Sequence, residues 1–515
     1  MVLGELPAGW EKAELSEICL VNPTIDKSAI ADDLAVSFVP MPAVEAENGA
    51  VDVSATRKFG DVKKGYTPFR EGDVLFAKIT PCMENGKMAV VPVLHNGLGF
   101  GSTEFHVLRA HPGISPQFVY HFVSSRSFRH VAEHNMSGAV GQRRVTTPYL
   151  SACTIPVPPT AEQHRIVAKI EELFSELDQG VASLKTAREQ LKVYRQSLLK
   201  NAFEGKLTAA WRAAHRDQLE SATALQQRIA RERQARYQQQ LADWQAAGQS
   251  GPKPKPPKPL PPLTAEEVAE LPELPVGWGW VRLEALISRV DQGWSPKCDG
   301  RRVDENEWAV IKTTAIQHGR FDEFENKALP PGLEPRTQHE LQPGDILVTR
   351  AGPRIRVGVC CLVRSVKPKL MNCDKAYRIR ALSSLCSAQF LESVLNSPRV
   401  LDVLERIKSG INDSGVNLNQ GAFLGLAIPF CGLTEQQAVV DELESKLSEA
   451  DQLDQTLATA LQQADALRQS ILKKAFCGQL VAQDPNDEPA TALLERIRAG
   501  KSNGMSTPRN RRKSG

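Results

Sequence analysis

Apolar residues recur at steps of three and four along two long stretches of the chain, residues 158–207 and 431–482. In the first stretch they are Ile166, Ile170, Leu173, Leu177, Val181, Leu184, Leu191 and Leu198. In the second they are Leu443, Leu447, Ala450, Leu453, Leu457, Leu461, Ala464, Leu467 and Ile471. A repeat near 3.5 residues, sustained over about five heptads with charged neighbours, is typical of a coiled coil. The pattern therefore predicts two long helices that pack on a partner helix.

Both helices follow equivalent segments, so the simplest arrangement packs them against each other, antiparallel, with one globular domain at each end. A helix of about 40 residues spans about 60 Å and would act as a ruler. The alternative is that each helix folds back on its own domain, which would leave the heptad seam without a partner. Thr160 with Glu162, and Thr434 with Glu435, predict a threonine N-cap and an acidic first turn for each helix.

Short apolar runs bounded by turn residues precede each helix and indicate mixed domains with short strands. In residues 1–157 the clearest strands are 72–79 and 104–109, and in residues 274–430 they are 344–350 and 375–380. We therefore expect an α+β protein. It would have two similar mixed α/β domains separated by two long antiparallel coiled-coil helices, with approximate two-fold symmetry.

The sequence also repeats itself directly. Residues 195–207 return as residues 468–480 with nine of thirteen positions identical, and the opening Leu-Pro-x-Gly-Trp at residue 6 returns at residue 274. The repeating unit is thus a domain followed by a helix. A preserved frame with divergent loops is expected if each copy binds a different target, and simple drift is the alternative.

Three further segments complete the chain. Residues 208–250 are rich in Gln, Arg and Ala and predict a helical insertion. Residues 251–273 form a proline-rich linker with an extended polyproline conformation, for which a spacer role is favoured over an SH3-type ligand. Residues 483–515 predict a C-terminal helix and a basic tail, which from Arg496 onward carries Arg496, Arg498, Lys501, Arg509, Arg511, Arg512 and Lys513. A solvated basic surface explains this charge as well as phosphate contact does.

Composition narrows the class of protein only a little. The 515 residues carry a net charge of +3, with 41% hydrophobic and 24% charged residues, as in ordinary globular proteins. No apolar run approaches the ~20 residues of a membrane span and no signal peptide pattern opens the chain, so we expect a cytoplasmic protein. The ten cysteines include no Cys-x-x-Cys pair and no accompanying histidine pair, and are expected to be buried free thiols rather than metal ligands.

Sequence motifs favour a binding protein over an enzyme. The chain has no P-loop, no dinucleotide-binding glycine motif, no His-Glu-x-x-His and no Gly-x-Ser-x-Gly. We therefore predict no catalytic residue and no metal ligand in this chain.

Each domain has two loops in which polar and basic residues stand beside glycine or proline: 78–87 and 138–145 in the first, 350–356 and 410–417 in the second. Arg and Lys recognise guanine edges, Asn and Gln recognise adenine, and the same groups bind phosphate. The candidate DNA-binding residues are Lys78, Thr80, Asn85, Lys87, Gln142, Arg143, Arg144, Arg350, Arg354, Arg356, Asn412 and Asn417. For any one of them, a phosphate contact or a plain surface charge is the commoner role, so the prediction concerns the loops more than single residues.

Several of these motifs together resemble the DNA-specificity (S) subunit of type I restriction and modification enzymes. They are the Leu-Pro-x-Gly-Trp openings, the Ile-Pro and Glu-Gln starts of the long helices, their Arg-Gln-Ser-Leu/Ile-Leu-Lys-x-Ala-Phe-x-Gly-x-Leu ends, and residues 484–490. The resemblance covers essentially the whole chain, including the linker, and residues 81–87 look like a loop that recurs in one class of recognition domains. It implies two target recognition domains, each of which recognises one half of a split DNA site.

The resemblance also implies partners. Two modification subunits would hold S-adenosylmethionine and methylate adenine N6, and restriction subunits would add ATP-driven translocation and nuclease activity. S-adenosylmethionine, ATP and Mg are expected in those subunits, and no cofactor is expected in this chain. Each domain would enter a major groove while the coiled coil fixes the spacer between the half-sites. The alternatives are a protein-binding coiled-coil adaptor, the specificity subunit of a methylation-only complex, and an autonomous DNA enzyme.

Overall fold

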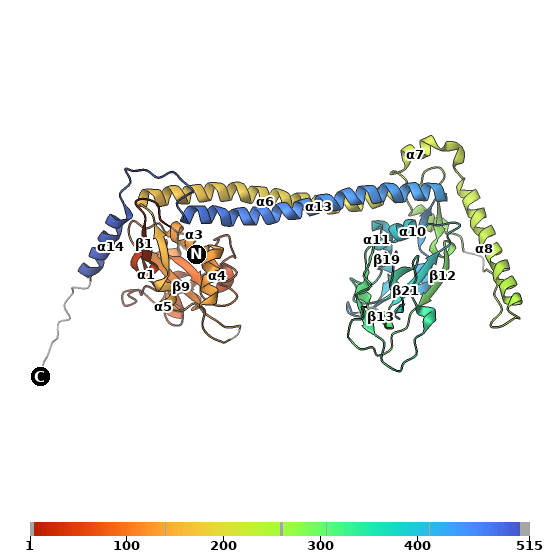
Figure 1. The fold of residues 1–515 in the computed structure, drawn as a ribbon, viewed down its shortest axis with the longest axis horizontal. Helices are drawn as coiled ribbons and strands as arrows, with labels where there is room; N and C mark the ends of the chain where they lie inside the picture. The colour runs from red at the N-terminus through yellow and green to blue at the C-terminus, as the bar shows by residue number, and fades with distance from the viewer. Residues whose placement is uncertain (1–4, 140, 258–260, 305, 411, 505–515) are drawn as a thin grey trace. The chain divides into compact units, whose positions relative to one another are not determined.

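The computed structural model describes residues 5–139, 141–257, 261–304, 306–410 and 412–504. The chain divides into two compact units: unit 1 combines Met1–Lys185 with Ala458–Gly515, and unit 2 is Thr186–Leu457. Each unit holds one sheet-rich domain and part of both long helices, α6 (Thr160–Phe203) and α13 (Leu433–Phe476) (Figure 1). The predicted α+β class, with two mixed domains and two long helices, is confirmed.

The domain of unit 1 is built on two four-stranded sheets. The order of the first is β2 (Cys19–Val21), β9 (Phe105–Ala110), β6 (Val74–Ala77), β7 (Met88–Val90). The order of the second is β4 (Thr56–Lys58), β3 (Ala35–Val39), β8 (Gly99–Gly101), β5 (Thr67–Phe69). A separate pair joins β1 (Glu11–Glu14) to β10 (Thr154–Val157). The main helices are α3 (Pro116–Ser124), α4 (Arg126–His134) and α5 (Thr147–Ala152).

The domain of unit 2 repeats this central plan. Its four-stranded sheet has the order β12 (Ile287–Gln292), β21 (Ala376–Ala381), β17 (Ile346–Thr349), β19 (Cys360–Leu362), and β11 (Gly279–Arg282) pairs with β24 (Ala427–Phe430). Smaller sheets join β16 (Asn326–Ala328), β13 (Ala309–Ile311) and β20 (Leu370–Met371), then β14 (Ile316–Gln317) and β15 (Arg320–Phe321), then β18 (Ala351–Gly352), β23 (Val416–Leu418) and β22 (Lys408–Ser409). The main helices are α10 (Ala388–Leu395), α11 (Pro398–Ile407) and α12 (Gln420–Leu424).

An equivalent ion pair, in which the aspartate is buried, joins the central strands in both domains. Asp73, before β6, pairs with Arg109 of β9 at 2.7 Å, and Asp345, before β17, pairs with Arg380 of β21 at 2.6 Å. Both aspartates are buried, and each follows a glycine with φ of +78° or +90°. A buried carboxylate is stable only when it is paired and hydrogen-bonded, so this pair sets the register of the two central strands.

Each long helix ends against the opening of the domain in the other copy. Near the end of α13, a Cβ on Gly478 would lie 2.2 Å from Pro7 Cγ, and near the end of α6, a Cβ on Gly205 would lie 2.5 Å from Pro275 Cγ. Both glycines have positive φ, +67° and +71°. The two repeated motifs are therefore the two sides of one packed contact, which occurs once in each unit.

The predicted threonine N-caps are wrong. The first helical hydrogen bonds run from Gln163 N to Pro159 O and from Gln436 N to Gly432 O, both 2.9 Å, so Pro159 and Gly432 hold the cap positions. The Thr160 hydroxyl instead donates to Gly113 O at 2.9 Å. The hydroxyl that the local sequence pattern assigns to capping thus forms a tertiary hydrogen bond instead.

The glutamine of each Glu-Gln start fastens the long helix to the neighbouring short helix. Ser115 N donates to Gln163 Oε1 and Ser387 N donates to Gln436 Oε1, both at 2.9 Å. The amide nitrogens of the same glutamines donate to Pro158 O and Leu385 O. Because both glutamines are fully buried, these bonds fix the direction in which each helix leaves its domain.

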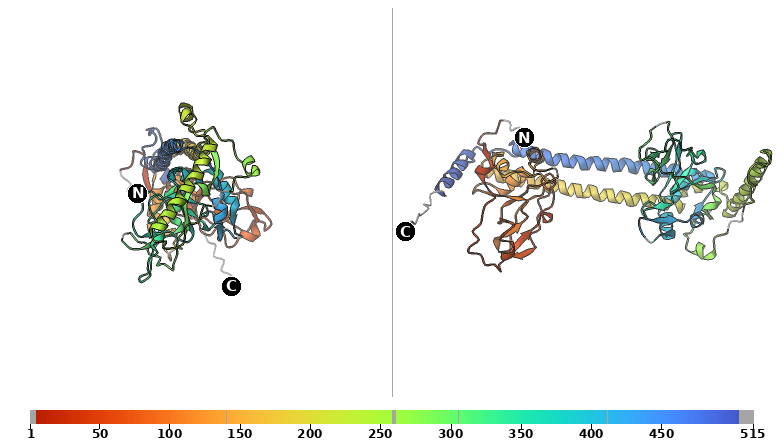
Figure 2. Two further views of the ribbon diagram at one scale, coloured as in Figure 1. Left: turned by 90° about the vertical axis from the view of Figure 1, so that its right-hand side faces the viewer. Right: turned by 90° about the horizontal axis from the view of Figure 1, so that it is seen from below.

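Within each unit, the segments of α6 and α13 run side by side in opposite directions (Figure 2). Arg188 pairs with Asp454 in unit 2, and Asp178 pairs with Arg468 in unit 1. Two predicted seam positions are wrong, because Leu453 and Leu467 are 50% and 52% exposed. The charged residues one position later occupy the seam instead. Polar pairs in such a seam specify register at some loss of stability.

The insertion contains α7 (Ala209–Ala214) and α8 (Ala222–Ala246), and α8 buries Leu225 and Ile229 in the core of unit 2. The described parts of 251–264 form neither helix nor strand, and α9 (Ala265–Ala269) follows. The C-terminal helix is α14 (Ala490–Gly504), which contains Arg496, Arg498 and Lys501 of the predicted basic tail, and the rest of that tail lies outside the described residues. None of the described helices is long and apolar enough to cross a membrane. The prediction of buried thiols holds for six cysteines, whereas four are partly exposed: Cys82, Cys153, Cys298 and Cys477.

Candidate nucleic-acid interface

The two candidate loops of each domain lie against each other. We call residues 78–87 and 350–356 the first loops, and residues 138–145 and 410–417 the second loops. In unit 1, Thr80 N donates to Arg143 O at 3.0 Å and Val145 N donates to Lys78 O at 2.8 Å. In unit 2, Arg354 N donates to Asp413 O at 2.7 Å, and Leu418 N, just after the second loop, donates to Arg350 O at 2.8 Å. Segments about 60 residues apart in sequence thus form one surface in each domain.

A side chain from the central sheet holds the second loop in each domain. In β9, His106 Nε2 lies 2.8 Å from Val145 O, and in β21, the Tyr377 hydroxyl donates to Leu418 O at 2.7 Å. Burial lowers the pKa of His106, although its bond to the Val145 carbonyl acts in the opposite direction. Because a carbonyl only accepts, neutral His106 carries its proton on Nε2. Two different side chains therefore give the same anchor.

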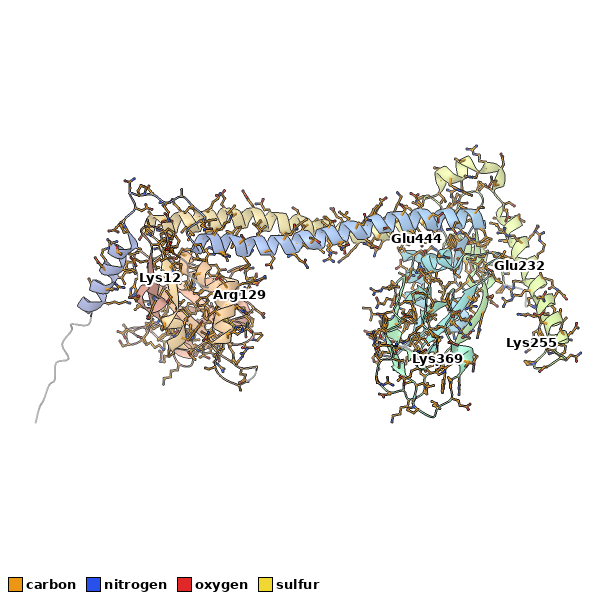
Figure 3. All side chains as sticks on the ribbon, viewed as in Figure 1. Lys12, Arg129, Glu232, Lys255, Lys369 and Glu444 are labelled. Atoms are coloured by element: carbon orange, nitrogen blue, oxygen red, sulfur yellow. The ribbon has the colours of Figure 1, made fainter. Side chains whose placement is uncertain are left out.

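Arg129 of α4, which is labelled in Figure 3, is buried and holds the first loop of unit 1. Its guanidinium donates to Glu84 O, to Glu47 Oε1 at 3.1 Å and to Ser124 O at 3.0 Å. A Cβ on Gly86, where φ is +67°, would lie 2.9 Å from Arg129 Nη1. Arg129 thus positions the loop. No sequence pattern indicates this role, because a basic residue on a short helix is usually exposed.

Most of the cationic candidates of unit 1 are bound within the protein. Arg144 donates to both oxygens of Glu104 at 2.9 Å, and this bond lowers the pKa of Glu104. The Lys87 ammonium donates to Val44 O at 2.8 Å. The remaining contacts are Thr80 Oγ1 to Glu84 at 2.8 Å and Arg143 to Glu133 at 3.9 Å. Lys78 is half-buried.

The arginines of unit 2 are bound in the same way. Arg354 pairs with Glu405 at 2.7 Å and with Asp413 at 3.0 Å, and these bonds raise its pKa. Arg356 Nη2 donates to Thr313 O at 2.6 Å and to Ile316 O at 2.7 Å. Arg350 donates to Asp374 O at 3.1 Å, and its guanidinium lies 5.7 Å from the centre of the Tyr377 ring.

The amide candidates are the ones presented to solvent. Asn85 and Gln142 in unit 1, and Asn412 and Asn417 in unit 2, are exposed, and their side chains form no hydrogen bond with the residues that the structure describes. A free carboxamide can donate and accept together, as the major-groove edge of adenine requires. The arrangement is therefore two loop pairs, each shaped by internal arginine contacts and each presenting amides outward.

The family model and the most similar known proteins that we compared belong to one family. A model described as the type I restriction modification DNA specificity domain matches residues 7–185. The chain is 36% identical over 505 residues to the type I restriction enzyme EcoEI specificity subunit of Escherichia coli, covering 91% of this chain and 83% of that protein. It is 28% identical over 508 residues to the EcoAI specificity subunit of Escherichia coli, with 90% and 82% covered.

Solved structures share the fold. The crystal structure of the HsdS subunit from Thermoanaerobacter tengcongensis matches with a TM-score of 0.52 at 20% identity, covering 93% of this chain and 99% of that chain. A chain from a study of complex assembly and conformational transition of the type I R-M system matches with a TM-score of 0.64 at 21% identity, covering 93% and 100%.

The matched family model, together with the duplicated domain, defines the class as a two-domain DNA-specificity protein. The identity to the EcoEI subunit is more specific, and the chain belongs to the specificity subunits of type I restriction enzymes. The family expected from the sequence motifs is confirmed.

Proposed function

We propose that each domain of this specificity subunit binds one half of a split DNA sequence through its pair of first and second loops. The observation that carries the proposal is the duplication of this surface on a common frame: the same ion pair, the same glutamine bonds and the same loop contact, with different exposed side chains. A repeated frame with two different reading surfaces suits two unlike half-sites.

The chain supplies recognition, and its partners supply the chemistry. Two modification subunits would methylate adenine with S-adenosylmethionine, and restriction subunits would use ATP and Mg, as the family resemblance implies. The purified chain alone is expected to transfer no methyl group to DNA, which a labelled S-adenosylmethionine assay with and without the modification subunits would test.

Exchange of residues 1–157 for the first domain of another family member tests the modular proposal. Only one half of the methylated sequence should change, because the second pair of loops is untouched. Methylome sequencing of the exchanged strain measures this, and exchange of residues 274–430 is the matched control. A change in both halves would contradict the proposal.

The antiparallel helices are proposed to set the spacer between the half-sites. Removal of residues 179–185 from α6 and 458–464 from α13 keeps the Asp178–Arg468 and Arg188–Asp454 pairs in register. Seven residues correspond to about 10 Å of helix, or about three base pairs of DNA. The expected methylome has the same half-sites with a shorter spacer, and methylation at the original spacer would refute the ruler.

A further inference from the structure

Ile355, in the first loop of unit 2, is 84% exposed, more than any other large apolar side chain that the structure describes. It lies between β18 and β19, two residues after the exposed Pro353. Single exposed apolar residues are common on protein surfaces, so exposure alone indicates nothing. The bonding of its two neighbours makes the position informative.

The residues on both sides of Ile355 are fixed. The Arg354 backbone nitrogen donates to Asp413 O at 2.7 Å, and its carbonyl accepts from Lys408 Nζ at 2.9 Å. Arg356 N donates to Pro353 O at 2.8 Å, while the Arg356 guanidinium holds two carbonyls of the neighbouring strand region. Both arginines thus bind the protein, and Ile355 is held outward between them in a defined place.

We propose that Ile355 reads the 5-methyl group of a thymine in the half-site bound by unit 2; this inference rests on the proposed function. The thymine methyl is the apolar group on the major-groove edges of the bases, and a side chain without donors or acceptors can select only that feature. Because isoleucine is β-branched, its χ1 is restricted, and little rotamer freedom is lost when it is buried.

The surroundings favour DNA over a protein partner. Arg354, the residue before Ile355, pairs with Glu405 and Asp413. The position therefore adjoins a charged cluster rather than the contiguous apolar patch that a protein interface needs. The exposed amide of Asn417 is on the adjoining strand, where Ala351 pairs with Asn417, and an amide recognises adenine. In unit 1 the exposed residues of the first loop are Pro81 and Asn85, so the inference concerns only the second half-site.

Deoxyuridine substitution tests the contact directly, since deoxyuridine differs from thymidine only by this methyl group. The complex of the full chain with its modification subunits is titrated with duplexes carrying the methylome-defined site. Each thymine of the second half-site, on either strand, is replaced in turn. At one thymine, replacement should weaken wild-type binding about three- to tenfold. The I355A complex should bind thymine DNA more weakly by the same factor and show no further loss with deoxyuridine.

The control is V276A, since Val276 is 82% exposed in the same unit but lies outside both loops. Its complex should retain the full deoxyuridine effect, and unfolding of I355A should match wild type. A second half-site without a sensitive thymine, or an undiminished deoxyuridine effect in I355A, overturns the inference. A wild-type complex that binds all DNA sequences equally would instead overturn the proposed function.

Discussion

The two domains keep the same bonds where they meet the long helices and different bonds where they hold the loops. Gln163 and Gln436 accept a hydrogen bond in the same way, from the backbone nitrogen of the serine that caps a short helix. Under the second loops, however, one domain uses His106 and the other Tyr377. A loop backbone can thus be held in one place by any polar side chain of suitable length, which leaves the exposed loop residues free to differ.

A second difference lies beside α6 and α13. His121 of α3 is buried against the Phe174 ring, with centroids 5.9 Å apart, whereas the equivalent position of α10, three residues after Phe390, is Ser393. Burial, with a smaller effect of Arg468, lowers the pKa of His121 to about 4. The helix contact of unit 1 should therefore depend on pH in a way that unit 2 does not share.

The largest expected effect tests the part that the domains share. G478A and G205A each place a methyl group within 2.5 Å of a proline at positive φ. Each should destabilise its own unit by about 3–4 kcal/mol, from overpacking together with backbone strain. Hydrogen exchange of the full chain would locate the loss. G248A, where φ is +68° and nothing lies within 4 Å, isolates the strain. Equal losses in all three variants would contradict the packed contact.

Acid should reveal a difference in stability between the two units, because only unit 1 has His121. The folded chain binds a proton at His121 near pH 4, and the unfolded chain near pH 6.5. The contribution of this residue is therefore intact above pH 6.5 and is lost as the pH falls toward 4. The loss reaches about 3 kcal/mol in unit 1. Urea unfolding with domain-resolved hydrogen exchange measures it. H121S, which copies unit 2, should remove the part due to His121, whereas His106, whose pKa burial also lowers, keeps its own part. If the stability of H121S depends on pH as strongly as that of the wild type, the dependence belongs to another group.

The exposed amides should affect one half-site each. N85A should relax base preference in the half-site of unit 1, and N417A in that of unit 2, by about 1–3 kcal/mol of discrimination. Because both side chains are exposed, stability should not change. Competition binding of the assembled methyltransferase against single-base variants of each half measures this. An effect of N85A on the second half-site would break the assignment of one domain to one half.

The smallest effect concerns the anchors below the loops. Y377F removes the hydroxyl that donates to Leu418 O and should destabilise unit 2 by about 1 kcal/mol, the net value of a buried hydrogen bond. Denaturant unfolding gives the value, and Y237F, on the partly exposed α8, is the control. A Y377F variant with unchanged stability would show that Phe423, which stacks on Tyr377 at 5.6 Å, suffices.

The sequence could predict the helices, the paired strands and the location of the four loops, because each depends on local periodicity or on a repeated motif. The sequence could not predict which basic side chains of these loops are free to contact DNA and which are paired within the protein. Glu104 and Asp413, the partners of Arg144 and Arg354, become neighbours only when the chain has folded. The seam error has a similar cause. Hydrophobicity favours Leu453 over Asp454 for the seam position. The ion pair of Asp454 with Arg188 shows that Asp454 occupies the seam between the helices.

The contacts of Pro7 with Gly478 and of Pro275 with Gly205 also bear on how such proteins diversify. In this chain each domain begins with its own proline, which packs on the glycine turn that follows the long helix of the other repeat. Recombination at the domain boundaries would therefore place a foreign domain, with its own opening proline, against a glycine turn that already accommodates it. New specificities can then arise by transfer of whole domains, without stepwise adjustment of the receiving subunit.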